Sequence, residues 1–165
     1  MEKIGLFYGS DAGTTKDIAQ KIAQHFENIE IIDVVNAKKE QILNFKNLIL
    51  ATPSYGSGDL QSDWESFLED LEEQDFQDKI VALVGVGDQD TYGDTFCNGL
   101  YEIYKIVSKN AKIIGQTSTD GYEFEESLCV IDGKFIGLML DQDNQEELSD
   151  ERISKWCETL KGQFN

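Results

Sequence analysis

Short apolar runs alternate with segments of helical periodicity along almost the whole chain. Ile4–Tyr8, Ile29–Val35, Leu48–Thr52 and Ile80–Gly85 are rich in apolar and β-branched residues, which is typical of strands buried in a sheet. The segments between them place apolar residues on one helical face. Parallel strands need crossover connections, and a helix is the usual one. The alternation therefore predicts a doubly wound α/β fold, with a parallel sheet covered by helices on both faces.

A fifth strand is expected in two pieces. Ala111–Gly115 begins it, Thr119-Asp120-Gly121-Tyr122 interrupts it, and strand character resumes over Lys134–Leu140. We therefore predict a five-stranded sheet with an insertion within the fifth strand. Ser149 is expected to cap the last helix, because Asp150 and Glu151 follow in what would be its first turn.

Two further boundaries are predicted from local residue types. Pro53 follows the third apolar run and is expected to turn the chain out of the strand. Trp64, Phe67, Leu68 and Leu71 recur at helical spacing, which predicts an amphipathic helix from about residue 61 to residue 73. A shorter helix is expected at residues 36–43, directly after the second strand.

The segment Gly9–Thr15 lies where the first strand gives way to the first helix. The first N–H groups of a helix have no internal partners and carry partial positive charge, so they bind phosphate. The hydroxyl groups of Ser10, Thr14 and Thr15 add further donors. A Walker A motif needs a lysine that this loop lacks, so a nucleoside triphosphate is not expected.

Two more polar loops follow the third and fourth apolar runs, at residues 53–58 and 85–94. The carboxyl ends of parallel strands meet at one edge of a sheet, where ligands bind in doubly wound folds. Tyr55 and Tyr92 each lie in one of these loops, and two tyrosines can stack on the two faces of a flat ring. The three loops together predict a site for a flat, phosphorylated cofactor.

Composition limits the functions that are open to the chain. Its 165 residues are expected to form one domain, residues 1–165, because only one proline and no low-complexity tract suggest a linker. The formal charge of −18, from 32 acidic and 14 basic residues, opposes binding to nucleic acid or to anionic membranes and favours basic protein partners. No apolar run is long enough to span a membrane, and three scattered cysteines suit a reducing compartment, so a cytoplasmic protein is expected. One histidine leaves zinc and serine-histidine chemistry without their usual groups.

Several motifs resemble those of flavodoxins, which are small electron carriers that bind flavin mononucleotide (FMN). They are Ser10-Asp11-Ala12-Gly13-Thr14-Thr15, Gly58-Asp59-Leu60-Gln61-Ser62-Asp63-Trp64, Gly87-Asp88-Gln89 with Tyr92, Ser118-Thr119-Asp120-Gly121-Tyr122 and Leu140-Asp141-Gln142-Asp143-Asn144-Gln145. The resemblance covers the whole chain, and the interrupted fifth strand is similar to that of the long-chain flavodoxins. It implies a flavodoxin-like sheet with strand order 2-1-3-4-5.

The resemblance also implies which residues hold the cofactor. Ser10 to Thr15 would bind the phosphate, with the side chain of Asp11 expected to point away from it. Tyr92 would stack on the outer face of the flavin, Tyr55 would cover the inner face, and Asp143 would reach the ribityl chain. Backbone groups of Gly58, Asp88, Thr95 and Cys97 would meet the polar edge of the ring. The full predicted set is Ser10, Asp11, Ala12, Gly13, Thr14, Thr15, Pro53, Ser54, Tyr55, Gly56, Ser57, Gly58, Gly87, Asp88, Tyr92, Thr95, Phe96, Cys97 and Asp143.

The function that this resemblance implies is one-electron transfer by non-covalently bound FMN, without catalysis. Reduction adds negative charge to a flavin in an acidic protein, so a low-potential carrier is expected. The partners implied are oxidoreductases with basic docking surfaces, such as a pyruvate-oxidising oxidoreductase or a nicotinamide-dependent flavodoxin reductase. The protein itself is expected to be a monomer. A flavin-dependent quinone reductase of the same fold remains the alternative, although two tyrosines over the ring argue against the open face that such an enzyme needs.

Overall fold

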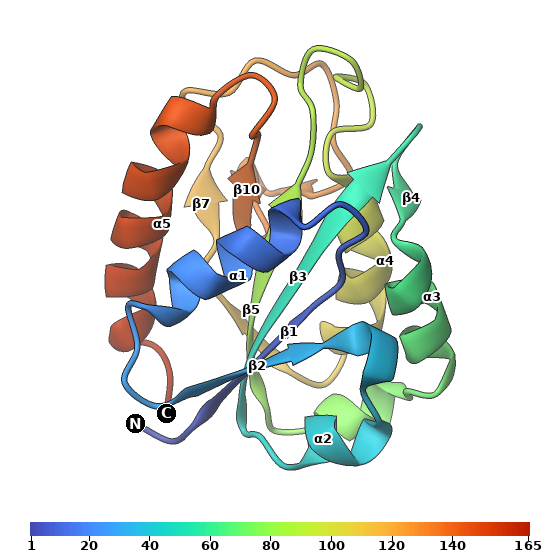
Figure 1. Ribbon diagram of the computed structural model, residues 1–165, viewed down its shortest axis with the longest axis vertical. Helices are drawn as coiled ribbons and strands as arrows, with labels where there is room; N and C mark the ends of the chain where they lie inside the picture. The colour runs from blue at the N-terminus through green and yellow to red at the C-terminus, as the bar shows by residue number, and fades with distance from the viewer.

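A parallel sheet runs through the centre of the computed structural model, which describes residues 1–165 (Figure 1). Four of its strands lie in the order β2, β1, β3, β5, with β2 at one edge, and two short strands complete the far edge beside β5. This arrangement confirms the predicted doubly wound α/β fold. The strand bounds are β1 Ile4–Tyr8, β2 Ile29–Asp33, β3 Asn47–Tyr55, β5 Ile80–Val86, β6 Lys112–Ile114 and β10 Leu138–Leu140, while β4 Asp59–Leu60 pairs antiparallel with the end of β3.

The position beyond β5 is shared by β6 and β10. Both run parallel to β5, β6 opposite Ile80–Ala82 and β10 opposite Val84–Val86. Between them the chain forms a separate antiparallel sheet of β7 Thr117–Ser118, β8 Val130–Ile131 and β9 Lys134–Phe135. The prediction that one strand resumes at Lys134 is therefore wrong, because Lys134 belongs to this second sheet and the main sheet is rejoined only at Leu138.

Gly137 explains why the chain can change sheets at that point. A Cβ atom built on Gly137 would lie 2.1 Å from the carbonyl oxygen of Leu83, in the neighbouring strand. Only glycine allows the backbone to pass so close to β5 before β10 begins. This contact joins residues far apart in the sequence, so local strand propensity did not reveal the break.

Helices cover both faces of the sheet. α1 Thr14–Ala23 and α5 Glu146–Lys161 lie on one face, while α3 Ser62–Glu69 and α4 Asn98–Val107 lie on the other (Figure 1). A short α2 helix, Lys39–Leu43, follows the 3₁₀ turn η1 Val34–Asn36 at the edge of the sheet, and a second 3₁₀ turn, η2 Glu73–Phe76, precedes β5. The predicted layering is thus present, with several elements shorter than expected.

Some predicted element ends are displaced for identifiable reasons. The second strand ends at Asp33 rather than Val35, because the Asp33 carboxylate accepts the Val35 N–H at 3.0 Å and starts the η1 turn. Ser149 does not cap the last helix. It is buried in the first turns of α5, where its hydroxyl contacts the Gln142 side chain, and the helix begins at Glu146.

The prediction that the strand ends at Pro53 is also wrong, because β3 continues to Tyr55. The Ala51 carbonyl accepts the Gly9 N–H at 3.2 Å, so Ala51 faces the β1 side of β3. The N–H and C=O groups of successive residues in a strand point to opposite neighbouring strands, so the backbone groups of Pro53, two residues after Ala51, also point to the β1 side. Strand β1 already ended opposite Ala51, and the missing N–H of Pro53 therefore breaks no ladder.

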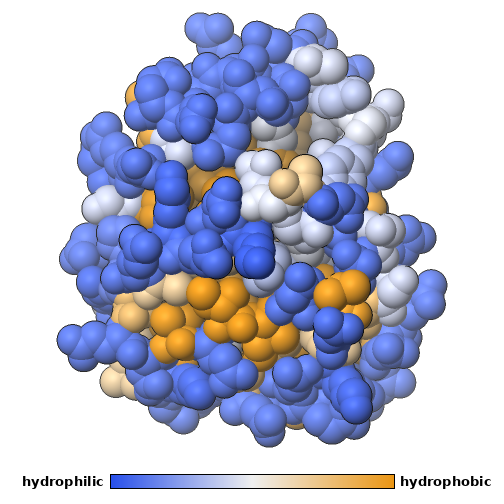
Figure 2. Space-filling view, viewed as in Figure 1, coloured by the Kyte–Doolittle hydropathy of each residue, from blue (hydrophilic) through white to orange (hydrophobic).

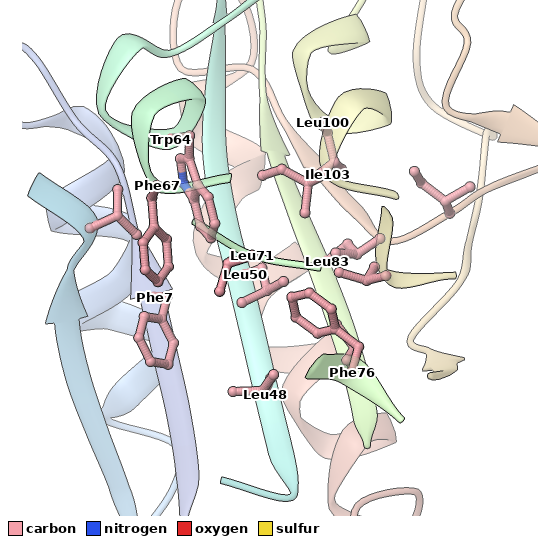
Figure 3. Close-up of a cluster of buried hydrophobic side chains, with 14 of the residues drawn as sticks. Phe7, Leu48, Leu50, Trp64, Phe67, Leu71, Phe76, Leu83, Leu100 and Ile103 are labelled. Atoms are coloured by element: carbon pink, nitrogen blue, oxygen red, sulfur yellow. The ribbon is translucent and has the colours of Figure 1, made fainter. Parts of the chain in front are cut away.

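Alternate residues of the central strands enter two separate cores. Phe7, Leu48, Leu50 and Leu83 pack with Trp64, Phe67 and Phe76 on the α3 and α4 side (Figure 3). Leu6, Ile49, Ala51 and Ala82 face α1 and α5. The rings of Phe7 and Phe67 stack with centroids 6.1 Å apart. Burial on both faces explains why the strands read as continuous apolar runs.

The surface is largely hydrophilic in the view of Figure 2, with an apolar area below α1. None of the helices combines the length with the apolar character that crossing a bilayer requires. The carboxyl ends of the parallel strands, and the loops that follow them, gather at the upper end in Figure 1, away from both chain ends.

Candidate cofactor site

A cleft of about 260 Å³ opens at the carboxyl edge of the sheet. The loops after β1, β3 and β5, which the sequence singled out, all line it, together with the segment after β10. The lining residues are Ser10, Ala12, Thr14, Thr15, Pro53, Ser54, Tyr55, Gly56, Val86, Gly87, Asp88, Tyr92, Gln142 and Asp143. The predicted meeting of the three loops is thus observed.

The first loop forms a compact turn that ends in helix α1. Gly13 precedes the helix with φ of 93°, a left-handed conformation that glycine adopts at little cost. Its N–H donates to the Ser10 hydroxyl oxygen at 3.0 Å, which closes the turn. The first N–H groups of α1, from Thr14 and Thr15, have no preceding carbonyl within the helix, so the start of α1 can receive an anion at the cleft.

The environment of Thr15 also favours an anion at the start of α1. The residue is 1% exposed, and its hydroxyl oxygen is buried without any hydrogen-bond partner. A buried hydroxyl group without a partner costs on the order of 1–3 kcal/mol, so such groups call for an explanation. A phosphate oxygen at the start of α1 would supply the missing partner.

The second loop continues from β3 and returns through β4. The Gly58 N–H donates to the Tyr55 carbonyl at 3.1 Å, and Gly56 has φ of 51°. The hydroxyl oxygen of Ser54 accepts the Gly99 N–H at 2.8 Å, which fixes this loop against the start of α4. Tyr55 remains 37% exposed at the wall of the cleft. Burial raises the pKa of Tyr55, as does the nearby charge of Asp11.

The third loop carries Asp88 and Tyr92. The Tyr92 N–H donates to the Asp88 carbonyl at 3.0 Å, and Tyr92 as a whole is 38% exposed. The Asp88 carboxylate accepts N–H groups of Asp90 and Thr91 and the amide of Asn144, at 3.1, 2.9 and 2.9 Å. Burial raises the pKa of Asp88, but these hydrogen bonds outweigh burial and hold that pKa below its usual value. Asp88 is therefore a carboxylate at neutral pH, and it helps to shape the loop.

Asp141 joins the third loop to the segment after β10. Its carboxylate is fully buried and accepts the Gln89 N–H at 3.0 Å and the Gln89 side-chain amide at 2.8 Å. It also accepts the N–H groups of Asp143 and Asn144, at 3.2 and 3.0 Å. One buried charge thus holds two of the segments that line the cleft.

Asp143 lies beside this network on the cleft wall. Burial raises its pKa, and the negative charges of Asp88 and Asp141 raise it further. The side chain is exposed and accessible to a ligand with hydroxyl groups. Its place agrees with the predicted contact to a ribityl chain, which itself stays a prediction.

Seven predicted residues do not line the cleft. They are Asp11, Gly13, Ser57, Gly58, Thr95, Phe96 and Cys97. Phe96 and Cys97 are buried behind Gly87, where a Cβ atom would lie 2.9 Å from the Cys97 sulfur and 3.0 Å from the Phe96 ring. Their side chains therefore pack beneath the floor of the cleft.

Two lining residues, Val86 and Gln142, were missed by the sequence analysis. Val86 is the last residue of β5, and Gln142 follows β10 by two residues. Both lie at the carboxyl ends of strands, so the strand ends themselves were the signal that could have found them.

Comparison with known proteins gives matches over the full length of the chain. A sequence model of the family described as flavodoxin matches residues 6–156. The flavodoxin of Helicobacter pylori is 53% identical over 164 residues, which are 99% of this chain and 99% of that protein. A flavodoxin from a Nostoc species is 42% identical over 167 residues, which cover 99% and 98% of the two chains.

A solved structure shares the whole architecture. The Fusobacterium nucleatum flavodoxin bound to flavin mononucleotide superimposes with a TM-score of 0.95 at 43% identity, covering 100% of both chains. These matches span the three loops and the sheet that holds them. The chain therefore belongs to the flavodoxin family.

Proposed function

We propose that this protein carries single electrons between oxidoreductases on non-covalently bound FMN. The observation that carries the proposal is the buried Thr15 hydroxyl without a partner, located at the start of α1 and at one end of a cleft walled by two tyrosines. When bound, FMN supplies a group that takes up and gives back one electron at a time. Membership of the flavodoxin family and the FMN-bound F. nucleatum relative support this assignment.

The chain's own residues would bind the cofactor in three parts. Hydroxyl groups of Ser10, Thr14 and Thr15 and the N–H groups at the start of α1 would hold the phosphate without a cationic side chain. The rings of Tyr55 and Tyr92 would enclose the flat ring, and offset stacking contributes on the order of 1 kcal/mol per contact beyond burial. Backbone groups of the second and third loops would meet its polar edge.

The partners are redox proteins, and we propose that they dock through basic surfaces. The net charge of −18 favours their approach, because opposite charges accelerate diffusional encounter. A pyruvate-oxidising oxidoreductase and a nicotinamide-dependent flavodoxin reductase remain the proposed partners, with the protein acting as a cytoplasmic monomer. Tyr55 and Tyr92 would cover the ring faces, which disfavours a quinone reductase that must bind substrate on an open face.

Slow dithionite reduction of the purified protein under argon, followed by absorption spectroscopy, tests the proposal. A yellow protein that passes through a blue one-electron-reduced form is the expected result. Failure of the protein to take up added FMN would refute the proposal. Rapid bleaching by a nicotinamide cofactor alone, with no reductase present, would favour the enzyme instead.

A further inference from the structure

The first loop, Gly9–Thr15, which we call the phosphate loop, contains an acidic residue that does not line the cleft. Asp11 lies between two lining residues, Ser10 and Ala12, yet it does not line the cleft itself. A carboxylate turned toward a bound phosphate would repel it, because like charges at short range destabilise each other. The orientation of Asp11 therefore bears directly on how well this loop can hold a phosphate.

Gln61 holds Asp11 in its outward orientation. The Gln61 side chain is fully buried, and its amide nitrogen donates to Asp11 Oδ1 at 3.0 Å and to Asp63 Oδ2 at 2.7 Å. Both hydrogens of the amide are thus used on carboxylates, and bonds to charged acceptors are the stronger class. The Gln61 oxygen accepts the Trp64 N–H at 3.0 Å, which caps helix α3 and fixes the orientation of the amide.

The loop is shaped to receive Gln61. A Cβ atom on Gly9 would lie 2.2 Å from Gln61 Oε1, so the absence of a side chain at Gly9 lets the amide reach the base of the loop. Trp64 Nε1 donates to the Ala51 carbonyl at 2.8 Å and ties the start of α3 to the sheet. Gln61 therefore belongs to the start of α3, and its fixed amide group holds the Asp11 side chain of the loop before α1.

We propose that Gln61 is a positioning residue for phosphate binding, which it serves by holding the Asp11 charge away from the phosphate. The inference rests on the proposed function, since it concerns the phosphate of FMN. It follows that Gln61 sets the preference for FMN over riboflavin, which has the same ring and side chain without the phosphate. A residue that only capped α3 would affect both ligands alike.

The test compares dissociation constants of FMN and riboflavin for the apoprotein, measured by quenching of flavin fluorescence at fixed pH and ionic strength. Gln61→Asn is the main variant, because asparagine is a good N-cap residue but is one methylene shorter and would no longer reach Asp11. We expect it to weaken FMN binding by about tenfold, because the released Asp11 carboxylate can turn toward the phosphate and like charges repel, and to weaken riboflavin binding by less than about twofold.

Two further variants separate the proposed role from a structural one. Asp63→Asn is the matched control, because it changes the other carboxylate that Gln61 contacts but leaves the phosphate loop intact, and it should not alter the FMN to riboflavin ratio. In an Asp11→Asn background the effect of Gln61→Asn on FMN should fall below about twofold, since contacting residues are coupled in a double-mutant cycle.

The inference would be overturned if Gln61→Asn weakened the binding of FMN and of riboflavin equally. It would also be overturned if Gln61→Asn still weakened FMN binding by about tenfold in the Asp11→Asn background. If the wild-type protein bound riboflavin and FMN equally, the inference would fail while flavin binding stood. If it bound neither flavin, the proposed function would fail and the inference with it.

Discussion

The side chain of Asn47 and the backbone of Asn165 exchange two hydrogen bonds. Asn47 Nδ2 donates to the Asn165 carbonyl at 3.0 Å, and the Asn165 N–H donates to Asn47 Oδ1 at 3.2 Å. Asn47 also donates to the Glu2 carbonyl at 3.1 Å and is fully buried at the start of β3. The Asn47 side-chain amide thus joins the start of β3 to the backbone near both ends of the chain.

Replacing Asn47 by leucine should destabilise the fold without affecting the cleft. The substitution leaves backbone groups of Glu2 and Asn165 without partners, at a cost of about 1–3 kcal/mol in the free energy of unfolding. Urea denaturation of the apoprotein measures this loss. Asn165→Ala keeps the backbone bonds and should cost well under half as much. A change in FMN affinity for Asn47→Leu would contradict the separation between this contact and the site.

Alanine should be tolerated far better at Gly56 than at Gly58. Both glycines have positive φ, so each substitution carries strain of about 1 kcal/mol. At Gly56 a Cβ atom would meet only Asp59 Oδ2, at 3.6 Å, whereas at Gly58 it would lie 2.7 Å from Asn98 Cβ. Overpacking adds about 1–3 kcal/mol to Gly58→Ala. Chemical denaturation of both variants tests the order, and equal losses would contradict it.

Alkaline pH should destabilise the protein through its buried thiols. Burial raises the pKa of Cys129 and of Cys157 to about 12, and that of Cys97 above its ordinary value. The unfolded chain releases these protons at lower pH than the native state does, so the free energy of unfolding should fall as the pH rises from about 9 toward 12.

The same burial protects the thiols from reagents. Native protein at pH 8 should react with a thiol-specific reagent much more slowly than unfolded protein, in which all three cysteines become accessible. Replacement of Cys129 by alanine should flatten part of the alkaline decline. Fast labelling of the native state would show that the burial is transient.

Asp141→Asn should loosen two walls of the cleft together. The substitution removes a buried charge that accepts N–H groups of Gln89, Asp143 and Asn144, and we expect a loss of about 2–3 kcal/mol in stability together with weaker FMN binding. Asp143→Asn is the control for the loss of stability. Burial and neighbouring charges raise the pKa of Asp143, so its ionised form opposes folding at neutral pH and its removal should stabilise the apoprotein.

Tyr92→Ala should raise the dissociation constant of FMN by about tenfold, through loss of stacking and of apolar burial. Tyr92→Phe keeps the ring and should bind FMN within about twofold of wild type, since the ring face makes the contact. Tyr101→Ala is the comparison variant, because Tyr101 stacks on Tyr104 along α4 and does not line the cleft. Unchanged affinity in Tyr92→Ala would remove this ring from the proposed site.

The sequence predicted those features that local patterns encode. The bounds of β1 and the strand-to-helix junction within Gly9–Thr15 follow from an apolar run and from the helical pattern that begins after it, and the structure has both. The doubly wound topology follows from strand and helix alternation alone. The fold class can therefore be predicted from the sequence.

Features set by distant contacts were not accessible in this way. The end of β3 depends on where β1 stops opposite Ala51, and the break before Leu138 depends on the approach of Gly137 to Leu83. Beside the cleft, the fully buried Gln61 and Asp141 belong to motifs that the sequence analysis singled out, but their supporting roles were not predicted, because those roles depend on partners from other elements. Residues that contact a ligand were easier to predict than residues that hold the contacts in place.

The two faces of β3 and β5 differ in the size of their side chains, and this difference specifies how these two strands align. Both faces of the central strands are apolar, so polarity alone would permit a strand to slip by one residue. Such a slip in β5 would push Leu83 toward α5, into space that Ala82 and Val84 occupy, and would leave a void beside Phe76. In β3 and β5 the register is thus encoded by side-chain volume, with Leu48, Leu50 and Leu83 on the α3 and α4 face and Ala51 and Ala82 on the α1 and α5 face.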